Sequence, residues 1–392
     1  MAAEHLSRAF DQNVRGWKVL ALWIREVDNK YYKCYAVLSL LICFVIYDGL
    51  LSLNLLYCPR NLEDFVPEVL FYFTSVVLVF KIHMVVFKNK LILKVFSILD
   101  SDEFAGETAE HKEINATFIS LYRKAFVMYF WIGHIAFMGY TLIPLLKFIF
   151  IGKKLTLSVC KYYFLTDEEK EDKLFFYWCY QSIGNYVHMN YSVHTDTFMP
   201  GLIFMGIGQF KALNMRLSNI KSKSKKGKDL RHEKHLEKEL VQCLKHYDMI
   251  REYCSLIEEL FDSAMFVQFG VGALINCVAF IGLLQQPTEG RFFMMLYDVM
   301  MTVQIFTPGF AGTQLAHESG LTTSAAYSCD WISRSASFKR SLVLLVERAN
   351  QAVELTACSM FPLSLATFIS IMKGAYSCFT LVRAMNIREE NE

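Results

Sequence analysis

Three residues with metal-binding chemistry, His188, His194 and Asp196, lie close together in the chain. Imidazole and carboxylate groups are common ligands of zinc and other transition metals. Their spacing of six and then two residues does not bring all three side chains to one face of a helix. We therefore expect no metal here, and the sequence predicts no other cofactor.

Catalytic motifs are also missing from the sequence. The chain contains no nucleophile motif, no histidine-rich metal box and no glycine-rich phosphate loop. Its eleven cysteines show no CxxC pair or zinc-type spacing, and such residues more often act as small buried hydrophobes. The formal net charge of +2 gives no indication of nucleic acid. We expect a protein that is not an enzyme and has no nucleic-acid partner.

Four charged residues, Asp48, Lys81, Asp298 and Lys373, stand inside long apolar stretches. A charge in hydrocarbon is unfavourable, so such residues usually face a protein interior or a polar cavity. We expect these four to face inward, with partners that the sequence does not identify. Buried charges also suit a membrane transporter, although the chain lacks the internal repeat that many transporters show.

Seven long apolar stretches must position these residues. Hydrophobic residues make up 54% of the chain and aromatic residues 15%, which is more than a soluble domain usually has. A helix needs roughly 20 apolar residues to cross the hydrocarbon of a bilayer. We expect an all-α membrane protein with seven transmembrane helices, at residues 36–57, 66–87, 125–147, 174–209, 261–284, 292–315 and 360–383.

The loops between these stretches differ in positive charge, and cytoplasmic loops are the ones enriched in Lys and Arg. The segments 1–35, 88–124, 210–260 and 316–359 carry 28 Lys and Arg residues, against 9 in the alternate loops and the C-terminal end. The N-terminus is therefore expected in the cytoplasm and the C-terminus outside. This topology is opposite to that of the G-protein-coupled receptors.

The organisation of the chain follows from this topology. The first residues are mixed polar and charged and give no sign of a signal peptide. Cys58, Cys160 and Cys179 fall near the outer face, where one disulfide among them stays an open alternative. In chain order we expect a cytoplasmic N-terminal segment (1–35), transmembrane helices one to four (36–209), a cytoplasmic loop and helix (210–260), transmembrane helices five and six (261–315), a second cytoplasmic helix (316–359), the seventh transmembrane helix (360–383) and a short outer tail (384–392).

Two cytoplasmic segments have apolar faces that lipid does not cover. Residues 232–261 repeat apolar side chains at helical spacing and continue without a break into the fifth stretch. Residues 324–355 predict a second helix of this kind. Such faces need a partner, either within the chain or in another subunit. The lysine-rich run Lys221–Lys228 is expected to be a solvated loop, with lipid-headgroup contact as the alternative.

The last apolar stretch carries the most specific motif. It contains the runs SLATF at Ser364–Phe368 and YSCFTL at Tyr376–Leu381. These runs resemble the last helix of insect odorant receptors, in which Ser-Leu-x-x-Phe and Tyr-Ser-x-Phe-Thr-Leu are typical. The overall organisation is similar to that family over the whole chain, whereas recognisable motifs are confined to the last third. The Gln-Phe pair typical of the related gustatory receptors is missing, and the cytoplasmic loop is shorter than in the co-receptor Orco.

The resemblance implies a ligand-gated, non-selective cation channel. Four subunits would surround one pore lined by the seventh helices, and this chain would be the ligand-binding subunit of a hetero-oligomer with Orco. It would lie in the plasma membrane of olfactory sensory neurons, where a volatile organic odorant, membrane lipid and permeating cations are its other partners. The alternatives are a homomeric channel of the gustatory-receptor type and a membrane transporter.

The resemblance also implies a gate near the outer end of the seventh helix. By position in the family's motif, Leu381 matches the gate-forming hydrophobic residue, and Phe379 and Ala384 flank it. Rings of apolar side chains close a pore by dewetting. The alternative is that Leu381 faces lipid or a neighbouring helix. Lys373 and Arg383 are unusual in a cation pore, so they either snorkel or face away from it.

The odorant site is expected in the outer half of the bundle, between helices two, three, four and six, with a contribution from five. A pocket for small, mostly apolar volatiles is rich in aromatic and methionine side chains. Tyr186, His188 and Tyr297 offer hydrogen bonds to an ester, alcohol or aldehyde oxygen. The alternative for each candidate is core packing or lipid contact. The candidates are Phe71, Tyr72 and Val76 on helix two, His134, Phe137, Met138 and Tyr140 on three, Tyr186, His188 and Met189 on four, Phe280 on five, and Met294, Tyr297 and Met301 on six.

Overall fold

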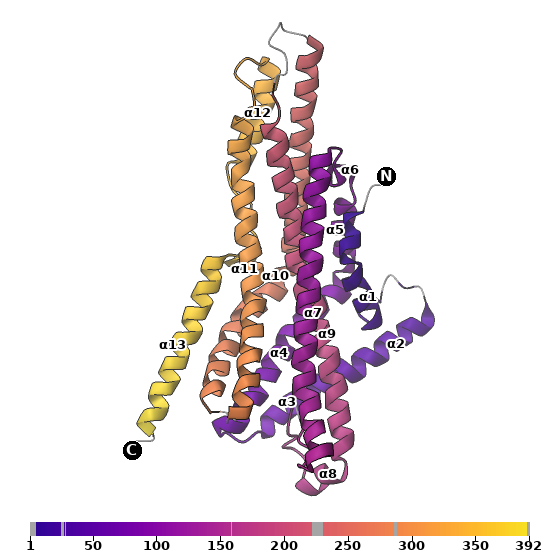
Figure 1. Cartoon of the computed structure of the whole chain (residues 1–392), viewed down its shortest axis with the longest axis vertical. Coiled ribbons are helices and arrows are strands. Elements are labelled where there is room, and N and C mark those ends of the chain that lie inside the picture. Colours follow the sequence, from indigo (N-terminus) through magenta and orange to yellow (C-terminus); the bar gives the residue numbers. More distant parts are fainter. Residues whose placement is uncertain are drawn as a thin grey trace.

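A computed structural model describes residues 5–24, 27, 29–157, 159–221, 230–285 and 288–389 of the chain. This part is almost entirely helical, with a single two-stranded ladder among the described residues (Figure 1). Apart from Lys221, the lysine-rich run lies outside the described residues. The elements are η1 (Leu6–Phe10), α1 (Asp11–Val19), α2 (Lys30–Leu40), η2 (Leu41–Ile46), α3 (Tyr47–Tyr57), α4 (Leu62–Phe87), α5 (Asn89–Leu99), α6 (Asp102–Ala105), α7 (Ala109–Ile151), α8 (Asp167–Asp172), α9 (Leu174–Ser218), α10 (Leu230–Gln285), α11 (Thr288–Tyr327), α12 (Ala336–Ala349), β1 (Thr356–Ala357), β2 (Phe361–Pro362) and α13 (Leu365–Glu389).

Five of the described helical segments are long and apolar enough to cross a membrane. The fourth and sixth expected spans fall in α9 and α11, which run alongside these segments in the bundle (Figure 1). Both helices hold buried polar side chains, such as Gln209 and Thr322, that make them less apolar overall. The five segments are Lys30–Tyr57, Asp64–Phe87, Ala109–Ile151, Glu233–Leu283 and Leu365–Ala384.

Four helices are much longer than a bilayer requires. The helices α7, α9, α10 and α11 have 43, 45, 56 and 40 residues. At about 1.5 Å per residue, each exceeds a hydrocarbon core of about 30 Å. The extra length of α9, α10 and α11 projects to one end of the molecule, where α12 joins them (Figure 1). This end is the one expected in the cytoplasm.

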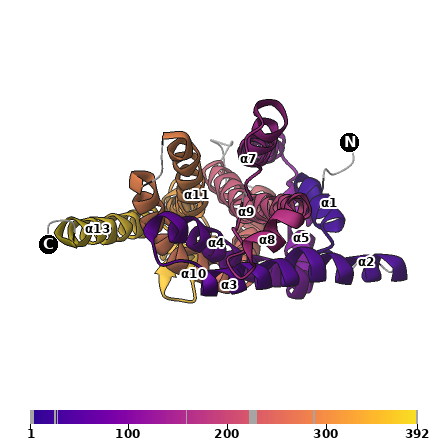
Figure 2. The same ribbon diagram turned by 90° about the horizontal axis from the view of Figure 1, so that it is seen from below.

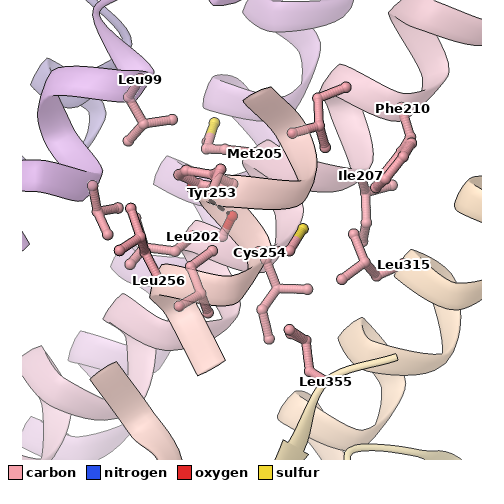
Figure 3. Close-up of a cluster of buried hydrophobic side chains, with 14 of the residues drawn as sticks. Leu99, Leu202, Met205, Ile207, Phe210, Tyr253, Cys254, Leu256, Leu315 and Leu355 are labelled. Carbon is pink, nitrogen blue, oxygen red and sulfur yellow. Dashed lines mark hydrogen bonds between the residues drawn. The ribbon is translucent and has the colours of Figure 1, made fainter. Parts of the chain in front are cut away.

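The end expected in the cytoplasm has a well-packed interior, the cytoplasmic core, that is continuous with the buried core of the rest of the bundle. Along 232–261 the side chains of Leu240, Tyr247 and Ile250 are fully or almost fully buried. Packing within the chain therefore accounts for this apolar face. Figure 3 shows the neighbouring part of the core, where the Tyr253 hydroxyl of α10 donates to the Leu202 carbonyl of α9 at 2.9 Å. This hydrogen bond satisfies a polar group that burial would otherwise leave without a partner.

The N-terminal segment packs into the bundle, which the mixed polar sequence did not predict. Phe10 and Trp17 are completely buried, and the Trp17 ring stacks on Trp23 with centroids 5.6 Å apart. The Asn13 amide donates to the His194 carbonyl at 2.7 Å and therefore fixes α1 against α9. A few large side chains thus hold an element that has no long apolar face.

The expectation of one cytoplasmic helix over 316–359 is wrong. The helix α11 continues to Tyr327, a turn follows, and α12 begins at Ala336. The Ser335 hydroxyl accepts a hydrogen bond from the Phe338 amide at 3.1 Å, which is the usual way in which serine begins a helix. The same cap lies within 324–355, so that segment is also not one helix.

The last helix begins at Leu365 rather than at 360. Before it, Thr356–Ala357 pairs antiparallel with Phe361–Pro362, and the Ser364 hydroxyl then accepts from the Thr367 amide at 3.2 Å. Figures 1 and 2 both show α13 apart from the main bundle along most of its length. Only 6% of its apolar membrane-spanning stretch is buried inside the chain. A long apolar face of α13 therefore stays uncovered in the single chain.

The charged residues of the apolar stretches divide into two groups. Lys81 and Asp298 are buried, and Asp48 is half-buried. Lys373 is exposed, so the expectation that it faces the interior of the chain is wrong. The reason is that α13 packs against α10 and α11 along one side only, and Lys373 lies on the other.

Candidate functional site

A largely apolar cavity lies between α3, α4, α7, α9 and α11. Its volume is about 160 Å³. One water-sized group needs roughly 10–15 Å³ of such volume, so the cavity has room for an organic molecule of on the order of ten heavy atoms. Seven of the residues expected from the sequence line this cavity, and they are Phe71, Phe137, Tyr140, His188, Met189, Tyr297 and Met301.

Helical spacing explains why some candidates line the cavity and others do not. On α4, the lining positions include Phe71, Thr74 and Leu78, which recur every three or four residues. Tyr72 and Val76 fall between these positions and do not line it. The rotation of α4 about its axis is set by its packing, so its sequence alone does not give the inward face.

The remaining candidates lie elsewhere. Met138 on α7 is 52% exposed, and Tyr186 on α9 is 42% exposed. The Tyr186 hydroxyl lies 3.5 Å from Nε2 of His134, and neither side chain lines the cavity. Met294 is buried in a separate apolar cluster of α4, α10 and α11, and Phe280 packs edge-on against Phe379 at 6.0 Å.

Several lining residues were missed by the sequence reasoning. Tyr47 and Leu51 come from α3 in the first span, and Val159 comes from the segment between α7 and α8. Tyr129 and Gln304 line the deeper part, where the cavity meets the polar groups of α4 and α9. Gln304 carried a usable signal, because an amide in an apolar stretch generally faces protein rather than lipid.

The polar groups on the cavity wall are mostly paired with the protein. The Tyr297 hydroxyl lies 2.5 Å from Oγ1 of Thr74 and donates to the Leu70 carbonyl at 3.3 Å. His188 donates from Nε2 to the Cys43 carbonyl at 3.1 Å. Cys43 belongs to η2, a π-helical turn, and such turns leave carbonyl groups available for side chains. These bonds orient both rings toward the cavity.

A hydrogen-bonded segment closes the end of the cavity near α8. The Gln181 side chain of α9 accepts from the Val159 amide at 3.1 Å and donates to the Cys160 carbonyl at 2.7 Å. Glu68 of α4 accepts from the Lys161 amide at 3.0 Å and from the Asn54 side chain at 2.7 Å. The segment therefore holds Val159 in place as part of the cavity wall.

The gate candidates lie on α13, away from this cavity. Leu381 is 63% exposed and Ala384 is also exposed, whereas Phe379 is half-buried against Phe280 of α10. In the single chain, Leu381 is therefore free to face another subunit, a pore or lipid.

Neither a disulfide nor a metal centre is found among the described residues. All eleven cysteines have free thiols, including Cys58, Cys160 and Cys179. No group of three or more His, Cys, Asp or Glu side chains in the described part of the chain is arranged to hold a metal ion.

Comparison with known proteins decides the family. A family model described as "7tm Odorant receptor" matches residues 61–376, which is most of the chain. The chain belongs to the insect odorant receptor family. The resemblance drawn from the last helix is thereby confirmed. The chain is a receptor rather than an enzyme, and it is a multi-pass protein of the plasma membrane.

Curated relatives match this receptor over part of their length. It is 34% identical to Odorant receptor 59a of Drosophila melanogaster over 148 residues, which is 37% of each chain. It is 24% identical to Odorant receptor 2a of the same organism over 211 residues, or 52% of this chain and 53% of the relative. Odorant receptor 10 of Aedes albopictus is 27% identical over 194 residues, or 49% and 50%. The receptor thus aligns with about a third to a half of these relatives.

The solved structures of the insect olfactory receptor OR5 from Machilis hrabei have the same fold. The complex with eugenol superposes with a TM-score of 0.85 over 98% of this chain and 100% of that chain, at 13% identity. The second OR5 structure gives a TM-score of 0.83 over 97% and 99%, at 14% identity. The expected all-α membrane fold is therefore confirmed.

Proposed function

We propose that this receptor is the ligand-binding subunit of an odorant-gated, non-selective cation channel that it forms with the co-receptor Orco. The observation that carries the proposal is the cavity of about 160 Å³, which is mostly apolar and has aromatic and methionine walls. Such a lining suits a small volatile molecule. The OR5 complex with eugenol, which has the same fold, gives independent support.

The proposed odorant site comprises the seven expected residues that line the cavity, from Phe71 on α4 to Met301 on α11. Their rings and thioethers would supply most of the contact area, with roughly 25 cal/mol gained for each Å² of apolar surface that the ligand removes from water. Tyr186, His134 and Met138 are not assigned to the site, because they face away from the cavity.

The helix α11 is the element that would connect ligand binding to the pore. It contributes Tyr297, Met301 and Gln304 to the cavity. Farther along the same helix, the Thr313 hydroxyl accepts from the Leu365 amide of α13 at 2.9 Å, and Phe306 packs edge-on against Phe368 at 5.4 Å. Suppose that α11 exchanges between two positions and that the ligand binds more tightly in one of them. Ligand binding would then raise the population of that position, and α13 would move together with α11.

The uncovered face of α13 supports a pore formed by several subunits. An exposed apolar surface of this length in a membrane protein is covered by lipid or by another chain. We place the pore along α13, with Leu381 in the gate and Phe379 and Ala384 beside it. Cations would pass when the apolar ring around Leu381 widens and becomes hydrated.

Co-expression separates this proposal from its alternatives. The receptor is expressed in a cell line with and without Orco, and currents are recorded during a panel of volatile esters, ketones, alcohols and phenols. Odorant-evoked, non-selective cation currents that require both subunits are expected. Robust currents from this chain alone would instead support a homomeric channel of the gustatory type, and transport without channel currents would support a transporter.

A further inference from the structure

A buried ion pair lies next to the deep end of the cavity. The Lys81 ammonium of α4 donates to Oδ1 of Asp196 on α9, and the two side chains are only 7% and 5% exposed. The Tyr129 hydroxyl of α7 donates to Oδ2 of the same carboxylate at 3.4 Å. The carboxylate therefore has a donor at each oxygen, and its charge is balanced by the lysine.

The lysine has more donors than this carboxylate uses. An ammonium group carries three N–H donors, and Asp196 is the acceptor of Lys81 among the described residues. Burying the other donors without an acceptor is unfavourable. Two small cavities, of about 10 and 20 Å³, border Lys81. Since a water-sized group needs roughly 10–15 Å³, each has room for about one oxygen atom.

Gln304 of α11 connects these small cavities with the ligand cavity. It borders all three. Its carbonyl accepts from the Gln268 amide at 2.7 Å, which fixes the backbone position, and its side chain interacts with the Tyr129 hydroxyl. Thr74 and Ser192 border both the ligand cavity and the smaller cavity next to Lys81. Polar side chains of Thr74, Ser192 and Gln304 therefore stand between the ligand cavity and the small cavity next to the ammonium group.

Two other polar groups of the cavity offer a ligand less. The Tyr297 hydroxyl already donates to the Leu70 carbonyl, and the Nε2 proton of His188 is held by the Cys43 carbonyl. A neutral imidazole that donates from Nε2 has only an acceptor at Nδ1. Among the lining residues, Asn185 is the other amide, on the α9 wall of the cavity. The Tyr47 hydroxyl also lines the cavity and has no hydrogen-bond partner among the described residues. Asn185 and Tyr47 are therefore the rival donors that an experiment must separate from Gln304.

We propose that the deep end of the cavity is a polar subsite for the hydrogen-bond-accepting oxygen of a small organic ligand. Gln304 would donate to this oxygen directly, and Lys81 would donate to it directly or through one water molecule. The preferred ligands are then ketones, esters, ethers and phenols that reach this end with their oxygen, over hydrocarbons of the same shape. The inference rests on the proposed odorant-binding function and adds the class of ligand and its orientation.

The test compares matched ligands on matched variants. The receptor is co-expressed with Orco, and concentration–response curves are recorded for pairs such as acetophenone and isopropylbenzene within a broad panel of oxygenated volatiles. In the wild type, the half-maximal concentration of the oxygenated member is expected to be about tenfold lower or more. This is the effect of losing one hydrogen bond that nothing else in the site replaces. Gln304→Leu should remove most of this preference, because it weakens the response to the oxygenated ligand and leaves the response to the hydrocarbon unchanged.

Two further variants make the result specific. Lys81→Met combined with Asp196→Asn removes both charges together, because removing one alone would leave a buried charge unpaired. This double variant should also reduce the preference, while Asn185→Leu should retain it. As a further control, Tyr47→Phe should retain the preference as well. Surface labelling of each variant shows that the protein reaches the membrane.

The outcomes separate the two claims. A wild-type receptor that reaches the surface with Orco and responds to no member of the panel contradicts the proposed function and the subsite together. Equal sensitivity to both members of each pair overturns the subsite and leaves odorant binding standing. The subsite is also overturned if Gln304→Leu weakens the response to both members alike, or if Asn185→Leu or Tyr47→Phe is the variant that removes the preference.

Discussion

At the residue scale, the cytoplasmic core contains two histidines that share one acceptor. Nε2 of His111 and Nε2 of His246 lie 3.1 and 3.0 Å from the Gln209 side-chain oxygen, and the two rings stack at 5.6 Å. Both lie outside the expected spans 125–147 and 261–284. Burial lowers the pKa of His246 to about 3, with the neighbouring His111 and Arg216 adding to it. Burial also lowers the pKa of His111.

This cluster predicts that acid destabilises the cytoplasmic core. An unfolded histidine titrates near about 6.5, so the unfolded chain binds more protons than the folded one below that pH. The stability contributed by the neutral pair is fully present above about 6.5 and is lost as pH falls toward the folded pKa values. Thermal unfolding of the purified receptor should show a lower midpoint at pH 5.5 than at pH 7.5.

The matched control for this prediction replaces the titrating groups. His111→Gln combined with His246→Gln keeps polar side chains that do not change charge between pH 5.5 and 7.5. The double variant should lose part of the difference between the two midpoints. If it keeps the full difference, other groups cause the acid sensitivity.

At the scale of elements, α11 and α13 meet through a close backbone contact. A Cβ atom added at Gly312 would lie 2.1 Å from the Leu363 carbonyl oxygen, just before α13. Gly309, one turn earlier, is similarly close to the Ser364 carbonyl at 2.9 Å. Glycine at these positions lets the two backbones touch, so a movement of α11 displaces the start of α13 directly.

Gly312→Ala is therefore expected to uncouple ligand binding from the pore. The methyl group forces the start of α13 away from α11, which should reduce the maximal odorant-evoked current severalfold at unchanged surface level. Gly320→Ala is the control on the same helix, because its added Cβ would meet Ala352 at an ordinary 3.9 Å. Normal currents from Gly312→Ala would rule out this contact as the route to the pore.

The elements also show what the sequence could predict. Apolar length identified the helices, because hydrocarbon thickness sets a minimum that few soluble helices match. It did not show that Phe71 faces the cavity while Tyr72 does not, since this depends on how α4 is rotated against α9 and α11. The burial of Phe10 and Trp17 was not predicted either, because their segment is short and rich in polar residues, and its burial depends on contacts with residues far along the chain.

At the scale of the whole molecule, α13 is the element that a single chain leaves unfinished. Its residues Ile369, Tyr376 and Leu381 are 48%, 61% and 63% exposed. The motif in this helix identified the family from the sequence alone, and its uncovered face fits the proposed assembly around a pore.

Leu381→Ala tests the gate within that assembly. A smaller side chain leaves a wider, more easily hydrated constriction, so the basal current in cells that also express Orco should rise above the wild-type level. Ile369→Ala, at the other end of α13, should leave the basal current unchanged. An unaltered basal current and ion selectivity in Leu381→Ala would place the gate elsewhere or in the partner subunit.

In the proposed function, the odorant binds in the cavity between α3, α4, α7, α9 and α11. This site is tested by the odorant concentration–response curve of Ala136→Phe, a variant that places an aromatic ring in the cavity. The control is Ile135→Phe, which adds the same ring at a neighbouring position of α7 that is 64% exposed. With both variants at the wild-type surface level, Ala136→Phe should shift the half-maximal concentration at least tenfold and Ile135→Phe should not shift it. An unchanged curve for Ala136→Phe would show that the odorant does not bind in this cavity.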